Sequence, residues 1–350
     1  MSAILRAPFP WFGGKSRAAS IIWQRFGDVA NYVEPFAGSL AVLLARPTPP
    51  RIETVNDLDC MVANFWRATQ EDPESVAKFA DWPVNEADLH ARHRWLVEQL
   101  PAHRERMTKE PDYHDPKIAG LWVWGLCQWI GTGWCVDHGV GESAAPLGKL
   151  PIQLPHLSGT GGTGMGIHRK LPHLSGTGRG IHRKLPHLSG TGRGIHRKLP
   201  HLSGTGRGAV ADLFEELAAR LRGVRVACGN WSRVLGESVT WRNGITGILL
   251  DPPYADGNME YAAGAGGVSG EVAAWARDNG ENPLLRIALC GYEGEHQMPD
   301  TWECVPWKAK GGYGNQRKDG ANDNARRERI WFSPHCLKPD KGQIAMFGAP

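Results

Sequence analysis

The feature of this 350-residue chain that most constrains its fold is a series of short apolar segments that each end in polar residues. Such segments end near Val33, Val55, Leu250 and Tyr292, and stretches of helical spacing lie between them. Strands that alternate with helices indicate an α/β fold with a mostly parallel sheet. Sites in such sheets lie beyond the carboxyl ends of the strands, so the polar residues there are the first candidates for function.

The expected strands are one that ends at Val33 and the segments 52–55, 224–230, 247–250, 286–292 and 327–333. The expected helices are one that begins within 40–44, then 58–70, 85–107, the apolar Trp-rich stretch 118–135 with a turn at its end, and 209–222. Hydrophobic residues make up 41% of the chain and charged residues 22%, which are values of a globular protein. No apolar run reaches the roughly 20 residues that a membrane-spanning helix needs.

The positive charge of the chain is concentrated in one segment. The net charge is +4, yet residues 143–211 contain ten Lys or Arg and no Asp or Glu, so the remainder carries −6, the difference between +4 and +10. A basic segment on a weakly acidic body indicates a polyanionic partner. Nine of its side chains are candidate contacts to nucleic acid: Arg169, Lys170, Arg179, Arg183, Lys184, Arg193, Arg197, Lys198 and Arg207.

The same segment is a tandem repeat with a period of 14 residues. PHLSGTGRGIHRKL occupies 172–185 and again 186–199, a shortened copy occupies 200–208, and a variant copy occupies 155–171. Glycine at alternate positions disfavours a helix, because each interior glycine costs about 1 kcal/mol relative to alanine. Two interpretations stay open: direct contact with nucleic acid, or a flexible spacer that arose by tandem expansion.

Asp251-Pro252-Pro253-Tyr254 follows the expected strand 247–250 directly. The two prolines hold φ at about −65° and remove two N–H donors, which makes the segment rigid. The Asp251 carboxylate and the Pro252 carbonyl then offer two acceptors, which match the two N–H groups of an exocyclic amine. Tyr254 offers a ring on which a base can stack, a contact worth about 1–3 kcal/mol. The four residues therefore predict a site that modifies the amino group of a base.

EPFAGS, at 34–39, follows the first expected strand. Gly38 permits a close approach of the backbone to a ligand. Asp57 comes 23 residues after Glu34 and follows the second strand, where nucleotide-binding α/β folds have an acid for the ribose diol. Gly13, Gly14 and Lys15 form a turn with a cation, but the spacing lacks the Walker pattern, so a nucleoside triphosphate is not favoured.

The order of PWFGGK, YVEPFAGS, Asn-Asp and ILLDPPY resembles the Dam-like DNA adenine-N6 methyltransferases over residues 8–68 and 209–335. The resemblance implies a Rossmann-like fold that takes the methyl group of S-adenosylmethionine and transfers it to N6 of a flipped adenine in double-stranded DNA. It implies four catalytic-motif residues: Asp251, Pro252, Pro253 and Tyr254. It implies these cofactor-binding residues: Trp11, Gly14, Lys15, Glu34, Pro35, Phe36, Gly38, Asp57, Asn230 and Asp251.

The chain departs from the family pattern at two places. Leu40 stands where the family loop often has a second glycine, and a leucine fits there if its φ is negative. The middle of the chain does not match the usual recognition domain. We therefore expect residues 1–69 and 209–350 to form a discontinuous catalytic domain. The expected insertion is 70–208, a target-recognition and DNA-binding region that contains the repeat at 155–208.

Two other readings stay open. The chain could be an amino-methyltransferase that acts on cytosine N4, RNA or a protein amide, or an inactive DNA-binding protein with a methyltransferase fold. A repeat-based structural module is not favoured, because the 54 repeat residues cannot define a chain of 350. Gln343–Phe347 resembles the peptide that binds the bacterial sliding clamp, which makes the clamp a second candidate partner. The seven cysteines are scattered and form no CxxC pair, which argues against a metal site and against a disulfide framework. The expected location is the reducing cytoplasm of a bacterial or phage-infected cell. A restriction system, a phage and a host regulator fit equally well.

Overall fold

The computed structural model of the chain describes residues 5–11, 13–129, 134–135, 208–254, 265–307 and 327–338. The tandem repeat, the nine basic candidates for DNA contact and Gln343–Phe347 lie outside these residues. Within the described ranges, no helix is both long and apolar enough to cross a membrane.

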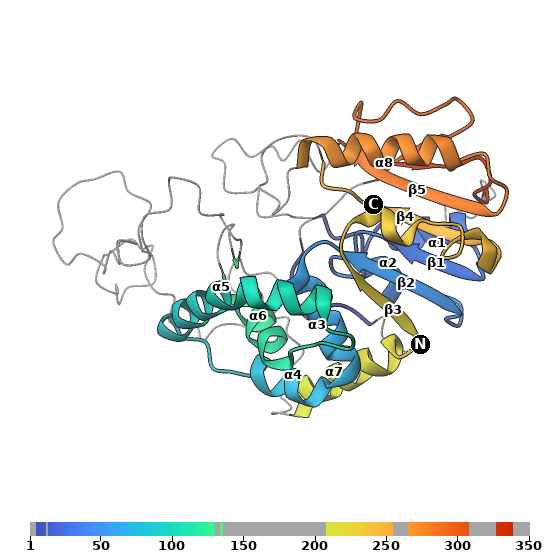
Figure 1. Cartoon of the computed structure of the whole chain (residues 1–350). Helices are drawn as coiled ribbons and strands as arrows, with labels where there is room; N and C mark the ends of the chain where they lie inside the picture. The colour runs from blue at the N-terminus through green and yellow to red at the C-terminus, as the bar shows by residue number, and fades with distance from the viewer. Residues whose placement is uncertain are drawn as a thin grey trace, which may run out of the picture. The chain divides into compact units, whose positions relative to one another are not determined.

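Seven strands of the described residues form one sheet in the order β3-β2-β1-β4-β5-β7-β6 (Figure 1). The strands are β1 (Asn31–Glu34), β2 (Ile52–Asp57), β3 (Val224–Cys228), β4 (Thr246–Leu250), β5 (Leu285–Tyr292), β6 (Glu303–Pro306) and β7 (Glu328–Phe332). Strands β1 to β5 are parallel, whereas β7 is antiparallel to both β5 and β6. The mostly parallel α/β sheet expected from the sequence is confirmed, and β6 is a strand that the sequence reading missed.

Helices fill the connections between the strands. They are α1 (Ala19–Phe26), α2 (Ala41–Leu44), α3 (Cys60–Glu71), α4 (Pro73–Ala80), α5 (Glu86–Lys109), α6 (Pro116–Gln128), α7 (Gly208–Leu221) and α8 (Ala265–Asn279), with 3₁₀ turns η2 (Trp231–Val234) and η3 (Trp241–Asn243). Several start where a side chain caps the first turn, as Asp59 does for α3 and Asp115 for α6. The expected helix after EPFAGS is only the four residues of α2.

The two faces of the sheet carry different helices because the strand side chains alternate. Tyr32, Leu249 and Ile330 belong to a buried cluster with α1, α2 and α3, whereas Val33 and Ile248 belong to a second cluster with η2 and α8. Helix α8 lies beside β5 in Figure 1. The polar groups at the ends of these strands are therefore held by a packed core on both sides.

Helices α4, α5 and α6 share the first cluster with α3 and α7. Phe9 lies 5.4 Å from the Trp122 ring of α6, and Phe65 of α3 lies 6.1 Å from Phe214 of α7. Residues before and after position 69, the expected boundary between the catalytic domain and the insertion, therefore share one hydrophobic core. The division of the chain into a catalytic domain and an inserted recognition region stays a prediction.

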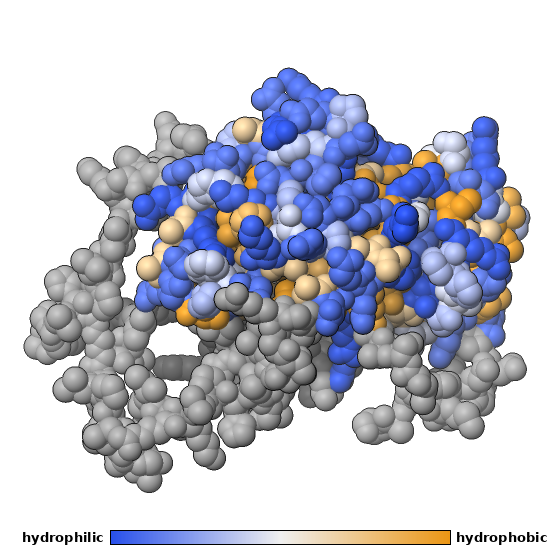
Figure 2. Space-filling model, turned by 90° about the horizontal axis from the view of Figure 1, so that it is seen from below, coloured by the Kyte–Doolittle hydropathy of each residue, from blue (hydrophilic) through white to orange (hydrophobic). Residues whose placement is uncertain are grey.

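The exposed apolar side chains of the described residues are few and separated. The largest exposed fractions belong to Leu58, Val84 and Trp82, at 55%, 53% and 50%. Figure 2 shows that the face drawn there is mainly hydrophilic, with small hydrophobic areas between polar ones. Single exposed apolar residues of this kind are normal for a protein surface.

Candidate active site

The strand order reverses between β1 and β4, which are hydrogen-bonded neighbours with Val33 opposite Ile248. The chain leaves β1 toward α2 on one face of the sheet and leaves β4 toward α8 on the other. Such a switch point opens a crevice beyond the carboxyl ends of the two strands. Glu34 ends β1 and Asp251 follows β4, so both carboxylates lie at this crevice.

Asp251 is held by two groups that the sequence reading had placed in separate motifs. Lys15 Nζ lies 2.8 Å from Asp251 Oδ1, and the Tyr254 hydroxyl lies 3.2 Å from the same oxygen. Lys15 also donates to the carbonyl of Gly13, whose positive φ forms the expected turn. The turn at Gly13 and Gly14 therefore places Lys15 in an ion pair with Asp251 of the Asp-Pro-Pro-Tyr motif.

Aromatic rings surround the Lys15 ammonium. Its Nζ lies 5.2 Å from the centre of the Tyr254 ring and 5.5 Å from that of Trp307, both within cation–π range. Tyr254 in turn meets the ring of Tyr292, at the end of β5, edge to face at 4.6 Å. Tyr254 thus keeps a fixed position beside the carboxylate that it follows.

The charges of this region influence one another strongly. Burial by itself would lower the pKa of Lys15, but the carboxylates of Asp251 and Glu328 raise it above its ordinary value, so the lysine stays charged. Burial raises the pKa of Glu34 to about 8, although the hydrogen bond from the Tyr32 hydroxyl at 3.0 Å opposes this rise. A cationic group bound beside Glu34 would restore its negative charge.

Gly38 is the tightest point of the EPFAGS loop. Its φ is +44°, and a Cβ placed there would run into the Trp11 ring. Its carbonyl accepts a hydrogen bond from Trp66 Nε1 at 2.9 Å. The structure thus brings Trp11 and the glycine loop together, as the resemblance implied for two parts of one cofactor pocket.

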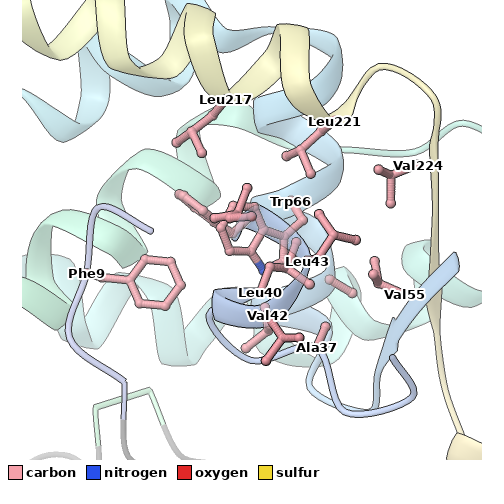
Figure 3. Close-up of a cluster of buried hydrophobic side chains, with 14 of the residues drawn as sticks. Phe9, Ala37, Leu40, Val42, Leu43, Val55, Trp66, Leu217, Leu221 and Val224 are labelled. Atoms are coloured by element: carbon pink, nitrogen blue, oxygen red, sulfur yellow. The ribbon is translucent and has the colours of Figure 1, made fainter. Parts of the chain in front are cut away.

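Leu40 does not meet the condition set for it from the sequence. Its φ is +51°, in the left-handed region, and its side chain is fully buried. Figure 3 shows Leu40 close to Trp66 within a cluster of apolar side chains. The backbone keeps the conformation that a glycine would adopt, at a cost of roughly 1–2 kcal/mol for a leucine. Burial of the side chain, worth about 1.5–3 kcal/mol, offsets that cost.

Asp57 ties two loops together. Its carboxylate accepts hydrogen bonds from the backbone N–H groups of Gly38 and Asp59, each at 2.9 Å. Burial and the neighbouring Asp59 carboxylate raise the pKa of Asp57 to about 7. Its neighbour Asn56 donates to the carbonyls of Pro35 and Gly229 at 3.0 and 2.9 Å. The ends of β1, β2 and β3 are thereby locked to one another.

Phe36 and Trp231 meet across two of these loops. Their rings are stacked at 6.4 Å with an angle of 26° between planes. Asn230, expected to border a bound adenine, uses its side-chain oxygen to cap the turn η2 through the N–H of Ser232 at 2.9 Å. Trp231 Nε1 and Asn56 Oδ1 are buried and have no hydrogen-bond partner among the described residues.

Glu328 is a residue of this region that the sequence reading missed. It begins β7, is 5% exposed, and accepts a hydrogen bond from the Tyr254 hydroxyl at 3.0 Å. A usable signal was present in the sequence: in Glu-Arg-Ile-Trp-Phe the charge falls on the same strand face as Ile330 and Phe332. Among the described residues, no group of His, Cys, Asp or Glu is arranged to hold a metal ion.

The sheet order, the glycine turn after β1, the acid at the end of β2 and the rigid carboxylate motif after β4 give a Rossmann-like α/β fold, an architecture whose switch point is a common place for ligands. Residues 11–113 match the family model of the D12 class N6 adenine-specific DNA methyltransferases. The match bears out the Dam-like resemblance over the N-terminal part of the chain, where the PWFGGK, EPFAGS and Asn-Asp motifs lie. A comparison with curated proteins finds no match to this chain.

Proposed function

We propose that this chain is a site-specific DNA adenine methyltransferase, which transfers the methyl group of S-adenosylmethionine to N6 of a flipped adenine in duplex DNA. The observation that carries the proposal is the Asp251 carboxylate at the switch point of the sheet, held by Lys15 and Tyr254. The match of residues 11–113 to the adenine methyltransferase family also supports it, because these residues include Lys15, Glu34 and Asp57.

The residues around the first three strand ends fit S-adenosylmethionine. Asp57 would accept the ribose hydroxyls, Glu34 would face the cationic end, and Phe36 and Trp231 would border the adenine. The buried and unpartnered Trp231 Nε1 and Asn56 Oδ1 offer a donor and an acceptor to a ligand there. Trp11, Gly14, Pro35, Gly38 and Asn230 complete the proposed pocket. When bound, the cofactor supplies a methyl group activated by its sulfonium.

Asp251 would act as an acceptor for the target amine. Among the described residues, Lys15 and Tyr254 contact this carboxylate, and both contacts are with Oδ1. We therefore assign Oδ2 to one N6 hydrogen and the Pro252 carbonyl to the other. Two such bonds localise the nitrogen lone pair and aim it, so positioning and electrostatics supply much of the acceleration. Pro253 keeps this geometry rigid.

Tyr254 would hold the flipped adenine. Its edge-to-face contact with Tyr292 fixes the orientation of the ring. A base stacked on such a ring gains about 1–3 kcal/mol. This gain offsets much of the few kcal/mol that extrusion from the duplex costs.

The remaining parts of the proposal rest on sequence alone. The nine basic residues Arg169, Lys170, Arg179, Arg183, Lys184, Arg193, Arg197, Lys198 and Arg207 would contact DNA phosphates. Gln343–Phe347 would bind a sliding clamp, and removal of residues after Gly342 would abolish co-elution with the clamp. The cytoplasm of a bacterial or phage-infected cell is the proposed location.

The experiment that tests the function is methyl transfer from labelled S-adenosylmethionine to unmethylated duplex DNA of mixed sequence, followed by nucleoside analysis. We expect N6-methyladenine from the wild type. Asp251→Asn should lower turnover by at least about 100-fold, the scale of losing one positioned transition-state contact, with cofactor affinity nearly unchanged. Asp300→Asn, at an exposed carboxylate in a loop, is the matched control.

Other outcomes separate the rival functions. N4-methylcytosine in the product would assign the cytosine reaction. Cofactor binding without label in DNA would contradict the DNA substrate and direct the search to RNA or protein. Absence of cofactor binding in a folded protein would favour an inactive DNA-binding protein.

A further inference from the structure

Glu328 occupies a position that the strand pattern assigns to an apolar residue. On β7, Glu328, Ile330 and Phe332 alternate toward one face, and Ile330 and Phe332 are almost fully buried in the first cluster. A carboxylate at such a place costs free energy unless it is paired and hydrogen-bonded. Within the part of the chain that the structure describes, its side chain accepts a hydrogen bond from Tyr254. We infer that the carboxylate is there to bind Tyr254 of the site and not to stabilise the sheet.

Glu328 and Asp251 compete for one proton. The Tyr254 hydroxyl lies 3.0 Å from Glu328 Oε2 and 3.2 Å from Asp251 Oδ1, and a hydroxyl has a single proton to donate. Asp251 Oδ1 already accepts from the Lys15 ammonium at 2.8 Å, which reduces its need for a second donor. The contact to Glu328 is the shorter one, and within the described ranges Tyr254 is the side chain that donates to Glu328, so both observations favour the hydrogen bond to Glu328.

We propose that Glu328 is a positioning residue for methyl transfer: it accepts the hydrogen bond from the Tyr254 hydroxyl, fixes the ring on which the target base stacks, and leaves Asp251 free to accept a hydrogen bond from the amine. This inference rests on the function proposed above. Glu328 itself touches neither the amine nor the cofactor in this scheme, since it acts through Tyr254.

The proposal predicts how turnover depends on pH. Charged or titratable groups that face Glu328 from the neighbouring elements are Lys15, Asp251, Tyr254, Cys290 and Glu295. Burial raises the pKa of Glu328, and the repulsion from Asp251 adds to the rise, while Lys15 opposes it. Once protonated, Glu328 donates to the Tyr254 oxygen, and Tyr254 then donates to Asp251. Asp251 becomes a weaker acceptor, so kcat should fall as the pH falls through the Glu328 pKa.

The test is a double-mutant cycle of Glu328→Gln and Tyr254→Phe in the full chain, with kcat and the KM for duplex DNA measured across pH. Glutamine keeps the shape of the side chain, and its oxygen can still accept a hydrogen bond from the Tyr254 hydroxyl, but it carries no charge and does not titrate. We expect Glu328→Gln to lower kcat about tenfold above neutral pH, the scale of one hydrogen bond to a charged group, with little change in KM. The acidic decline of kcat should disappear.

Adding Glu328→Gln to Tyr254→Phe should change kcat no further, because the hydroxyl that links the two residues is already gone. Glu303→Gln is the matched control: Glu303 lies at the other end of the β6–β7 pair and binds Arg25 at 2.7 Å, away from Tyr254. Melting temperature and cofactor affinity report whether each variant is folded.

Three results would overturn the proposal. The first is an equal loss of kcat from Glu328→Gln in the wild type and in Tyr254→Phe. The second is an unchanged kcat in Glu328→Gln. The third is a fall of kcat at acidic pH that is still present in Tyr254→Phe. The last result decides the matter even if Glu328→Gln does not fold. Full activity of Asp251→Asn would instead overturn the proposed function, so the two failures are distinguishable.

Discussion

Gly38 shows how one residue sets the geometry of the loop that follows β1. Its left-handed φ of +44° suits glycine, and the adjacent Trp11 ring leaves no room for a side chain. Its N–H binds Asp57 and its carbonyl binds Trp66, so both backbone groups have partners on other elements. Any residue with a Cβ must move either the loop or Trp11.

We predict that Gly38→Ala destabilises the protein by about 1–3 kcal/mol, the cost of a side chain in a sparsely allowed conformation. The affinity for S-adenosylmethionine should fall more than tenfold, because the loop and Trp11 both line the proposed pocket. Thermal unfolding and isothermal titration measure the two effects. Gly236→Ala is the control, since a Cβ there meets no atom within 4 Å. Equal cofactor affinity in the two variants would contradict the assignment of Gly38 to the pocket.

Single residues were predictable where one local motif determines them. The turn at Gly13 was expected from the two adjacent glycines, and Gly13 has the positive φ of such a turn. The burial of Lys15 was not expected. The pairing of Lys15 with Asp251 joins residues 236 positions apart, the difference between 15 and 251, and no spacing rule reveals it. Glu328 was missed although the alternation along β7 marks it as a buried charge, because its partner Tyr254 lies 74 residues away in the sequence. Leu40 kept a glycine conformation because its burial outweighed the strain.

At the scale of elements, the loops after β1, β2 and β3 act as one unit. Asn56 binds the carbonyls of Pro35 and Gly229, and Asp57 binds the N–H of Gly38. These links fix the distance between the parts that would hold the methionine, the ribose and the adenine. The protonation of Asp57 therefore matters both for the loop and for the ligand.

We predict that the affinity for S-adenosylmethionine rises with pH through about 7, which is the raised pKa of Asp57. Below that pH the carboxyl is protonated and offers fewer acceptor sites to the ribose hydroxyls. If binding requires the charged form, the dissociation constant rises about tenfold for each pH unit below 7. Titration calorimetry between pH 5.5 and 8.5, in buffers of roughly matched ionic strength, measures this dependence.

Asp57→Asn isolates the residue from the other titrating groups. The variant should bind more weakly at pH 8, and its affinity should no longer change through pH 7. Glu34, whose pKa is raised to about 8, keeps its own contribution in both proteins. A slope that persists in Asp57→Asn would assign the titration to Glu34 instead.

The elements that the sequence predicted are those with strong periodicity or clear ends. Strand β2 ends in Asn-Asp and α7 ends before Gly223, and both bounds fall within two residues of the expectation. Strand β6 and helix α8 were missed, because β6 is short and largely exposed and α8 contains several glycines. Helix α2 is short because the left-handed Leu40 begins it and Ala45 ends it.

At the scale of the whole molecule, segments from both sides of the tandem repeat build one core. Glu53 of β2 pairs with Arg46 at 3.2 Å and with Arg220 of α7 at 2.7 Å, and Arg220 also binds the carbonyl of Leu43. Phe214 and Leu217 of α7 are buried with α3. These contacts join the chain before the repeat to the chain after it without any repeat residue.

The final prediction follows from this independence. Replacing residues 155–207 with a Gly/Ser linker of about 20 residues should leave the melting temperature and the cofactor affinity unchanged. If the nine basic side chains contact phosphates, the affinity for DNA should fall. The slope of log K against log salt should then become shallower by up to about 8, at 0.9 per phosphate. Fluorescence anisotropy with duplex DNA at several salt concentrations measures both quantities.

A second variant separates charge from length. Changing the nine basic residues to glutamine keeps the repeat at full length, so a loss of affinity and slope equal to that of the linker variant assigns the effect to charge. An unchanged slope in both variants contradicts phosphate contacts by the repeat and makes it a spacer. Among the described residues, Lys15 and Tyr254 hold Asp251, and both lie outside the repeat, so kcat at saturating DNA should stay the same in both proteins. A fall in kcat at saturation would mean that the repeat also places the target base in the site.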